Sequence, residues 1–334
     1  MVCQWDCEGG VLLKEGDGVK ISGFTFLRNG SKLYYPICES IMSALALVDE
    51  FVVALGAGDS DDRTREMIES IGSDKIRIVD TVWDIDAFPD GTEHAHQTDI
   101  AKAACSGDWL LYLQGDEVLH EEDLPVIRNR CEAFLNDRDV DGMVFDYLHF
   151  WGDYEHYQLS HGWYKNEVRL VRNDVEIHSF ASAQSFRRIP DFDGVSYRKK
   201  QGTKKLRCVK AHARIFHYGW VRPPHMMQKK NRYIAVTHVG QKRSDEIFSG
   251  APLEFDYGPL NLTTRYNESH PQVMEAKIAS HDWKDELYES GGGSLHRQKH
   301  KHERLKYRFL TFVEQAILGG RPIAESRNYR LIKR

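Results

Sequence analysis

Two adjacent carboxylates, Asp116 and Glu117, stand close behind an apolar run at residues 109–113. Such a run predicts a buried strand, and ligands of open α/β sheets bind beyond the carboxyl ends of the strands. A carboxylate at that position can hold a divalent cation, which in turn can neutralise a diphosphate. On the residues alone a second interpretation stays open, in which the two acids only cap the helix that follows.

An aromatic segment at residues 150–164 is the second feature that could do chemistry. Aromatic faces stack on sugar rings and their polar tips bind hydroxyls, so the segment could form a platform for a carbohydrate. Ordinary core packing is the alternative. The segment contains Trp151, Tyr154, Tyr157, Trp163 and Tyr164, interleaved with His156 and His161.

The elements that must position these residues alternate between strands and helices over the first 150 residues. Apolar residues recur every second position along the strands, and three or four positions apart along the helices. This order implies an α/β fold with a mostly parallel central sheet flanked by helices. We expect strands at residues 19–27, 51–55, 75–82, 109–113 and 142–147, and helices at residues 37–48, 64–71, 98–105 and from about 121–125.

The alternation weakens after residue 150, and helical spacing returns only beyond residue 220. We therefore expect a polar leader at residues 1–18, an α/β domain at residues 19–220 and a largely helical extension at residues 221–334. In the second half, strands are expected at residues 167–171 and 213–218, a polar loop at residues 198–205, and helices at residues 226–239 and 307–318.

Charge and composition exclude several classes of protein. Forty-five Lys and Arg against 50 Asp and Glu leave a formal net charge of -5 over 334 residues, which argues against a protein that binds polyanions over its whole surface. No apolar run is long enough for a transmembrane helix, and the acidic start lacks the pattern of a secretion signal. We expect a cytoplasmic protein with free thiols. A basic run at residues 296–308 is most simply a solvated surface, although contact with anionic lipid or with a phosphorylated acceptor stays open.

Several motifs, taken in order, resemble the family 2 glycosyltransferases, whose nucleotide-sugar-binding domain has the GT-A fold. The resemblance covers roughly residues 20–220 and is closest to a subgroup with a Gln-Gly-Asp-Glu variant of the Asp-x-Asp motif. It implies an inverting, hexosyltransferase-like transfer from a nucleotide-diphosphate sugar to a hydroxyl of a glycan, lipid-linked or other acceptor, with Mn²⁺ or Mg²⁺ on the diphosphate. The motifs are Phe26-x-Arg28-Asn29, Glu39, the turn at residues 59–64, Gln114-Gly115-Asp116-Glu117 and His217-Tyr218-Gly219-Trp220.

The resemblance assigns donor-binding roles to six residues. Phe26, Arg28 and Glu39 match positions that line the nucleotide pocket. Asp59 and Asp62 lie in the turn that contacts base and ribose, although a turn that merely caps the next helix is the alternative. Gln114 replaces the first acid of the Asp-x-Asp motif by a neutral amide, which coordinates weakly or hydrogen-bonds the ribose.

The same resemblance predicts the metal ligands. With Gln114 uncharged, Asp116 becomes the chief protein ligand of the cation. The family often brings a histidine from the end of a late strand back to the metal, and His217 stands at such a position. A hydrogen-bonded core histidine is the alternative.

An inverting transfer also needs a general base beside the acceptor hydroxyl. Many relatives carry an acid in the segment after residues 169–172, where this chain offers Asp174 and Glu176 and then Gln184, an amide that cannot act as a base. Our catalytic candidates are therefore Asp116 as the metal anchor, Glu117 beside it and Asp153 in the aromatic segment. Without a clear base, a protein that binds nucleotide-sugars or carbohydrate without turnover is the alternative function.

Overall fold

A twisted sheet forms the centre of the protein, whose computed structural model describes residues 18–293, 297–324 and 327–334. The expected leader, apart from residue 18, lies outside the described residues, as do Cys3 and Cys7. The main strands are β1 (Ile21–Leu27), β2 (Glu50–Gly56), β3 (Ile76–Thr81), β4 (Trp109–Tyr112), β6 (Gly142–Trp151), β8 (Asn166–Arg172), β9 (Ile177–Phe180), β10 (Ser185–Arg188) and β11 (Lys204–Trp220).

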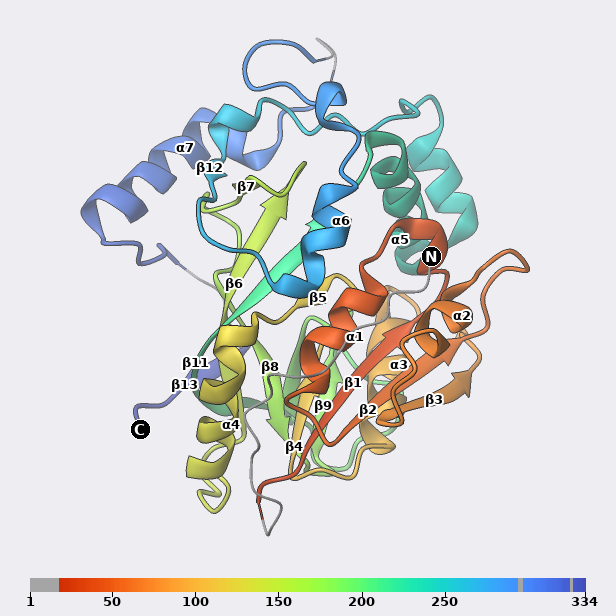
Figure 1. Cartoon of the computed structure of the whole chain (residues 1–334), viewed down its shortest axis with the longest axis vertical. Helices are drawn as coiled ribbons and strands as arrows, with labels where there is room; N and C mark the ends of the chain where they lie inside the picture. The colour runs from red at the N-terminus through yellow and green to blue at the C-terminus, as the bar shows by residue number, and fades with distance from the viewer. Residues whose placement is uncertain (1–17, 294–296, 325–326) are drawn as a thin grey trace.

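These strands lie in the order β3-β2-β1-β4-β8-β6-β11-β10-β9 (Figure 1). The first four of this order are parallel, β8 lies antiparallel between β4 and β6, and β6 runs parallel to β11. Two-residue strands add to the edges: β5 (Glu117–Val118) pairs with β11, and β7 (His156–Tyr157) pairs with β6. The predicted α/β class with a mostly parallel sheet is confirmed.

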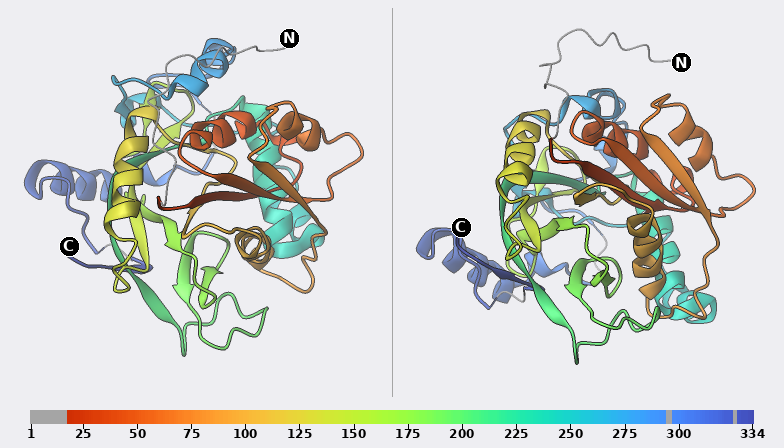
Figure 2. Two further views of the ribbon diagram at one scale, coloured as in Figure 1. Left: turned by 60° about the horizontal axis from the view of Figure 1, so that its bottom comes forward. Right: turned by 90° about the horizontal axis from the view of Figure 1, so that it is seen from below.

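Helices cover both faces of the sheet, as Figure 2 shows from two sides. Trp109 and Leu111 of β4 face the side covered by α1 (Ile37–Leu45), α2 (Thr64–Glu69) and α4 (Leu124–Ala133). Leu110 and Tyr112 face the opposite side, where α3 (Thr92–Ala103) packs. Because side chains alternate along a strand, a continuous apolar run can bury against helices on both faces.

Helix α3 begins at Thr92, six residues before the predicted start at residue 98. Its first turns carry polar residues, so the apolar spacing that signals a helix is absent there. Two of these, Glu93 and Gln97, are buried and hydrogen-bond each other at 2.7 Å. Tertiary burial therefore decides the start of this helix, where the sequence pattern gives no signal.

Strand β11 spans 17 residues, whereas the sequence predicted a strand only at residues 213–218. Its first half is rich in basic residues, and its first two residues fall in the polar loop expected at residues 198–205. The strand is interrupted by a shift of register between Lys210 and Arg214, where His212 has a positive φ of 57°. Such a bulge breaks the alternation of apolar and polar residues, so the period of a strand cannot be followed across it.

The C-terminal part is largely helical and returns to the main sheet at its end. Its longest helix, α5 (Pro224–Phe248), is kinked at Gly240. The other elements are β12 (Thr264–Arg265), α6 (Glu275–Ala279), α7 (Leu305–Phe312) with a π-helical turn at Val313–Ile317, and β13 (Tyr329–Leu331), which pairs with β11. Short 3-10 helices lie at Ser31–Leu33, Glu121–Asp123, Leu260–Leu262, Gln272–Met274, Lys284–Glu286 and Lys301–Glu303.

The division of the chain at residue 220 stays a prediction, since α5 packs directly against the first 3-10 helix of the α/β part. Within the part of the chain that the structure describes, no helix has the length and apolar character needed to cross a membrane. The described cysteines, Cys38, Cys105, Cys131 and Cys208, are free thiols.

Candidate functional site

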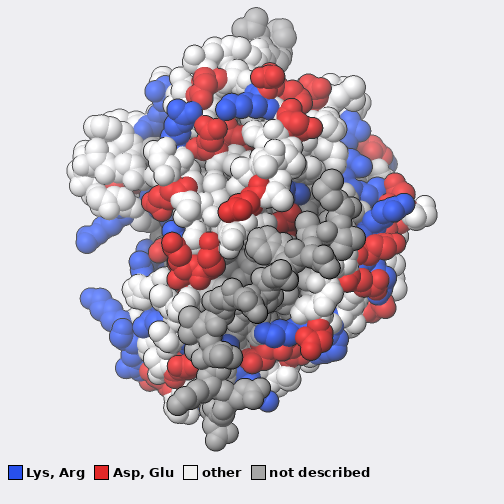
Figure 3. All heavy atoms as spheres, in the orientation of Figure 1, with Lys and Arg blue, Asp and Glu red and all other residues white. Residues whose placement is uncertain are grey.

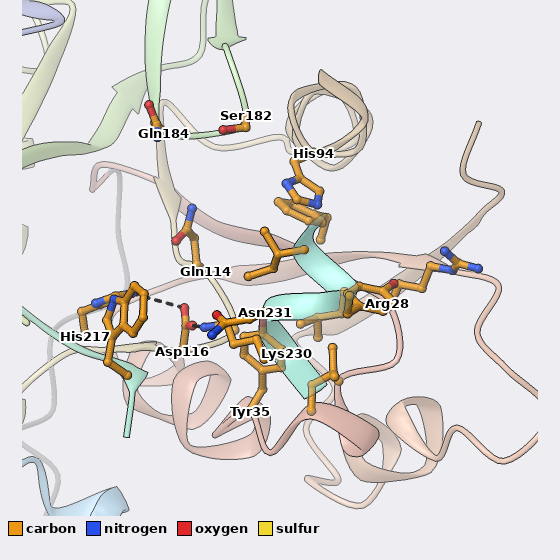
Figure 4. A pocket seen from close by; sticks show the side chains of 18 of the residues that line it. Arg28, Tyr35, His94, Gln114, Asp116, Ser182, Gln184, His217, Lys230 and Asn231 are labelled. Atoms are coloured by element: carbon orange, nitrogen blue, oxygen red, sulfur yellow. Dashed lines mark hydrogen bonds and ion pairs between the residues drawn. The ribbon is translucent and has the colours of Figure 1, made fainter. Parts of the chain in front are cut away.

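A cavity of about 370 Å³ lies at the carboxyl ends of β1 and β4. Residues that follow these two strands form its floor, and the N-terminal half of α5 forms the opposite wall (Figure 4). This is the position at which open α/β sheets bind ligands. The lining divides into an aromatic end, an ionic end and a turn between β9 and β10.

The aromatic end consists of Phe26, Trp83, His94 and His238. The ring of Phe26 stacks on His94 at 5.3 Å and contacts Trp83 at 5.9 Å, while His94 meets His238 edge-on at 5.6 Å. The Arg28 guanidinium lies over the Trp83 ring at 5.4 Å and donates from Nε to the Ala57 carbonyl at 2.8 Å. Flat rings beside a fixed cation can bind a nucleobase and its ribose.

His94 is held neutral at this end of the cavity. Burial and the neighbouring His238 lower its pKa from 6.5 to about 3. The unfolded chain therefore takes up a proton at His94 below pH 6.5, whereas the folded chain does so only near pH 3. The contribution of the neutral His94 ring to the unfolding free energy is therefore present above pH 6.5. It is lost as the pH falls from 6.5 to about 3.

We expect His94→Phe to reduce the loss of stability in acid. Between about pH 7 and about pH 4.5 the wild type should lose about 1–2 kcal/mol more unfolding free energy than the variant, because only the wild type has this proton to bind on unfolding. Urea titrations at the two pH values measure the difference. Equal losses in both proteins would contradict a neutral His94.

Asp116 anchors the ionic end. Its side chain is buried, and its Oδ2 accepts a hydrogen bond from the Lys230 ammonium of α5 at 3.0 Å. Lys230 also donates to the Gly219 carbonyl at 2.8 Å, and the Asp116 carbonyl accepts from the Tyr218 amide at 2.8 Å. Helix α5 thus holds the carboxylate of Asp116 through Lys230, while the end of β11 holds its backbone.

Electrostatics keep Asp116 ionised in spite of its burial. Burial raises the pKa of Asp116, but the positive charges of Lys230 and Arg222 outweigh that effect and hold it below its ordinary value. Burial and the positive charge of Arg222 lower the pKa of Lys230 to about 8. The pair therefore carries a negative and a positive charge at neutral pH.

His217 presents a free lone pair to this carboxylate. The Nε2 atom of His149 lies 2.9 Å from the Tyr164 carbonyl, which can only accept, so Nε2 carries the proton. Burial lowers the pKa of His149 well below its ordinary value, so its Nδ1 is an acceptor and takes a hydrogen bond from His217 Nδ1 at 3.0 Å. Since burial also lowers the pKa of His217, its Nε2 is left unprotonated, 3.8 Å from Asp116 Oδ1.

The lone pair of His217 and the carboxylate oxygen of Asp116 face each other with no proton between them. Two such acceptors repel unless a cation lies between them, and both atom types are ligands of Mn²⁺ and Mg²⁺ sites. The hydrogen bond from His217 to His149 is of the kind that fixes the tautomer of metal-binding histidines. Among residues 18–293, 297–324 and 327–334, no group of three or more His, Cys, Asp or Glu is placed to hold a metal. Asp116 and His217 would supply two ligands to such a cation, and its location here stays a prediction.

Gly219 leaves the space that such a cation would need. A Cβ atom at this position would lie 2.4 Å from His217 Nε2 and 2.9 Å from Asp116 Oδ2.

We expect Gly219→Ala to remove the gain in nucleotide affinity that Mn²⁺ gives, while nucleotide binding in EDTA persists. Calorimetric titration of nucleoside diphosphate with Mn²⁺ and with EDTA measures both quantities. An unchanged Mn²⁺ effect would contradict this location.

Glu117 has a structural position, although it is adjacent to Asp116. It is fully buried, and both of its oxygens bind the Arg169 guanidinium, at 2.7 and 2.8 Å. The Tyr147 hydroxyl also donates to this carboxylate. Glu117 is not among the described residues that line the cavity, and its catalytic role stays a prediction.

Phe26, Arg28, Gln114, Asp116 and His217, all predicted from the sequence, line the cavity together. Gln114 donates from Nε2 to the Ala183 carbonyl at 3.1 Å, which joins it to the β9–β10 turn.

Four other predicted residues are not in the described lining of the cavity. Asp62 caps its own turn, because Oδ1 accepts from the hydroxyls of Ser31 and Thr64, each at 2.6 Å. Asp59 pairs with Lys32 at 2.6 Å on the surface. Asp153 accepts from the backbone and ring of His156 at 2.9 Å, and Glu39 lies on α1. The hydrogen bonds of Asp62 agree with the alternative interpretation, in which the turn caps the next helix.

Sequence reasoning missed Trp83, His94, Lys230, Asn231 and His238, which also line the cavity. Lys230 is one of two adjacent lysines in a predicted helix, and nothing in the sequence marks it as buried. Trp83 lies just after β3, and His94 lies in the first turn of α3. The folding of α5 over the sheet adds Lys230, Asn231 and His238 to them.

No protein-family model matches this chain, and no curated protein matches it. Solved structures do match. S. aureus TarS 1-349 is 16% identical over 70% of this chain and 72% of its own, with a TM-score of 0.35. Glucosyl-3-phosphoglycerate synthase from Mycobacterium tuberculosis, in complex with Mn²⁺, UDP and glucosyl-3-phosphoglycerate, is 19% identical over 40% of this chain and 44% of its own, with a TM-score of 0.28. Likenesses of this extent assign no activity, so the function is argued from the cavity.

Proposed function

We propose that this chain is a metal-dependent glycosyltransferase of the GT-A, family 2 type, which transfers a sugar from a nucleoside diphosphate to a hydroxyl acceptor with inversion. One observation carries the proposal: a single cavity joins a cluster of aromatic rings to a buried Asp-His-Lys group. The aromatic cluster suits a nucleobase, and the Asp-His-Lys group suits a diphosphate.

The residues of the ionic end bind and orient the leaving group. Asp116 and His217 would hold Mn²⁺ or Mg²⁺, which supplies positive charge to the diphosphate as it departs. Lys230 adds a second positive charge at the same place, through an ammonium already oriented by Asp116 and Gly219. The sugar bond would break beside these groups, where negative charge develops on the diphosphate.

The β9–β10 turn faces the cavity from the side of Gln114 (Figure 4) and would contact the sugar. Ala181 and Ala183 have positive φ values of 58° and 56°, a strained arrangement that directs Ser182 and Gln184 to the lining. Arg169 donates to the Gln184 carbonyl at 3.2 Å and fixes the turn. Hydroxyl and amide side chains held in this way are suited to sugar hydroxyls.

A second candidate function follows from the acids of the cavity. Asp116 is the one carboxylate in its described lining, and it is paired with Lys230. Apart from Asp116, the described lining therefore holds no carboxylate that could act as the base for the acceptor. A protein that binds nucleotide-sugars without turnover would have the same cavity.

Thermal shift with UDP, GDP, CDP and dTDP, each with Mn²⁺, Mg²⁺ or EDTA, tests the donor site, because a ligand of the native state raises its apparent stability. UDP with Mn²⁺, present in the neighbouring structures, is the first pair to test. A shift that depends on the metal, together with release of nucleoside diphosphate from a sugar donor in the presence of acceptors, supports the transferase. Binding without turnover supports the second candidate, and the absence of any shift would overturn both.

A further inference from the structure

A row of large apolar side chains on α7 is exposed to solvent. Leu305, Phe309 and Phe312 are 80%, 67% and 61% exposed, and Ile317 in the π-helical turn is 66% exposed. Positions 305, 309 and 312 are four and three residues apart, so their side chains lie on one face of the helix. Figures 1 and 2 show that α7 projects from the body of the protein.

The opposite face of the helix is fixed to the protein. Glu314 is buried and binds the His161 ring at 2.7 Å, with the Lys165 ammonium 3.7 Å away. The Thr311 hydroxyl accepts from the His161 amide at 2.8 Å. The exposed apolar row is therefore held in a defined direction by contacts on the other side of the helix.

The exposed charges within residues 299–321 are all positive. Both acids of the segment are engaged: Glu303 with Arg297 at 2.5 Å, and Glu314 with His161. None of the exposed basic side chains forms an ion pair with a described carboxylate, although the chain as a whole has a net charge of -5. Figure 3 shows α7 as a largely white projection with blue side chains beside it. The exposed basic residues are Lys299, Lys301, Arg304, Lys306, Arg308 and Arg321.

We propose that α7 and its basic flanks, residues 299–321, form a surface that binds an anionic lipid bilayer. Apolar side chains of an amphipathic helix enter the boundary between headgroups and acyl chains, while flanking Lys and Arg attract anionic headgroups. A second copy of this surface is a poor partner, because pairing would bring two sets of unpaired cations together. The surface holds the protein at the membrane by its side chains, independently of the proposed catalysis.

Flotation of the full chain with vesicles tests the proposal. Vesicles of equal parts phosphatidylcholine and phosphatidylglycerol should bind the protein at low salt, and binding should weaken as salt rises. Vesicles of phosphatidylcholine alone should bind at least about tenfold less, because they lack the anionic headgroups. Equal binding to both kinds of vesicle would overturn the role of the charges.

Two pairs of substitutions separate the contributions of the surface. Lys306→Gln with Arg308→Gln should lower the partition coefficient about fivefold for each removed charge. Phe309→Ser with Phe312→Ser should lower it by about tenfold or more, since two inserted rings are lost. Matched controls are Val175→Ser, at a site 87% exposed, and Lys199→Gln with Lys200→Gln, which should leave binding unchanged.

All of these side chains are exposed, so the variants should keep the melting temperature of the wild type, which is measured alongside. If the α7 variants bind vesicles as well as the wild type does, the surface is not the one that binds lipid. If the wild type ignores vesicles and instead forms dimers that Phe309→Ser with Phe312→Ser abolishes, a second copy covers the row and the proposal is overturned.

Discussion

Asp116→Asn should lower kcat/KM for sugar transfer by about 100- to 1000-fold, because the group that anchors the positive charge at the diphosphate is lost. The substitution keeps the shape of the side chain but removes its charge, and with it the ion pair to Lys230 at 3.0 Å. Mn²⁺ should no longer raise the affinity for nucleoside diphosphate. Initial rates with labelled donor, and calorimetric titration with and without Mn²⁺, measure the two effects.

Asp99→Asn is a matched control for this experiment. Asp99 is a partly buried aspartate on α3 that binds the His178 ring at 2.8 Å, and it does not line the cavity. Its substitution should change stability and leave the Mn²⁺ effect intact. If Asp116→Asn retains its rate and its Mn²⁺ dependence, the ionic end of the cavity is not the site of the diphosphate.

Glu117→Gln should destabilise the fold by about 3–5 kcal/mol, since it leaves the Arg169 guanidinium buried without its counter-charge. Arg169 is 1% exposed and Glu117 is fully buried, so solvent cannot replace the lost carboxylate. Urea unfolding measures the change. Because Arg169 also holds the β9–β10 turn through the Gln184 carbonyl, sugar transfer should fall as well.

The double variant Glu117→Met with Arg169→Met distinguishes a buried ion pair from two independent sites. Replacement of both partners by apolar side chains removes both buried charges, so most of the lost stability should return. If the double variant loses as much unfolding free energy as the two single variants lose together, Glu117 and Arg169 do not act as a pair. A Glu117→Gln protein that is as stable as the wild type but inactive would instead support a direct catalytic role for Glu117.

The first half of the fold follows from residue patterns along the chain. The strands at β1 to β4 and the helices α1 and α2 are confirmed near their predicted bounds, because each buries a regular set of apolar residues. Helix α3 and strand β11 differ from prediction for different reasons. The start of α3 is a polar segment that becomes ordered through tertiary contacts, such as the pair Glu93 and Gln97. In β11 the bulge between Lys210 and Arg214 interrupts the alternation of apolar and polar residues.

The residue pattern alone places Asp116 and Glu117 behind a buried strand, at the binding edge of an α/β sheet. In the structure Asp116 ends the turn after β4, and Glu117 begins β5. Which of the two acids faces the cavity was decided by the pairing of β5 with β11, which brings Asp116 to His217 and leaves Glu117 against Arg169.

The roles of Lys230, His94 and His149 depend on the tertiary structure. Each has an ordinary residue type and no motif, and its role depends on partners far away in the sequence, 114 residues in the case of Lys230 and Asp116. Burial and charge then set its protonation and direction. These quantities depend on the whole packed environment, which local residue patterns do not encode.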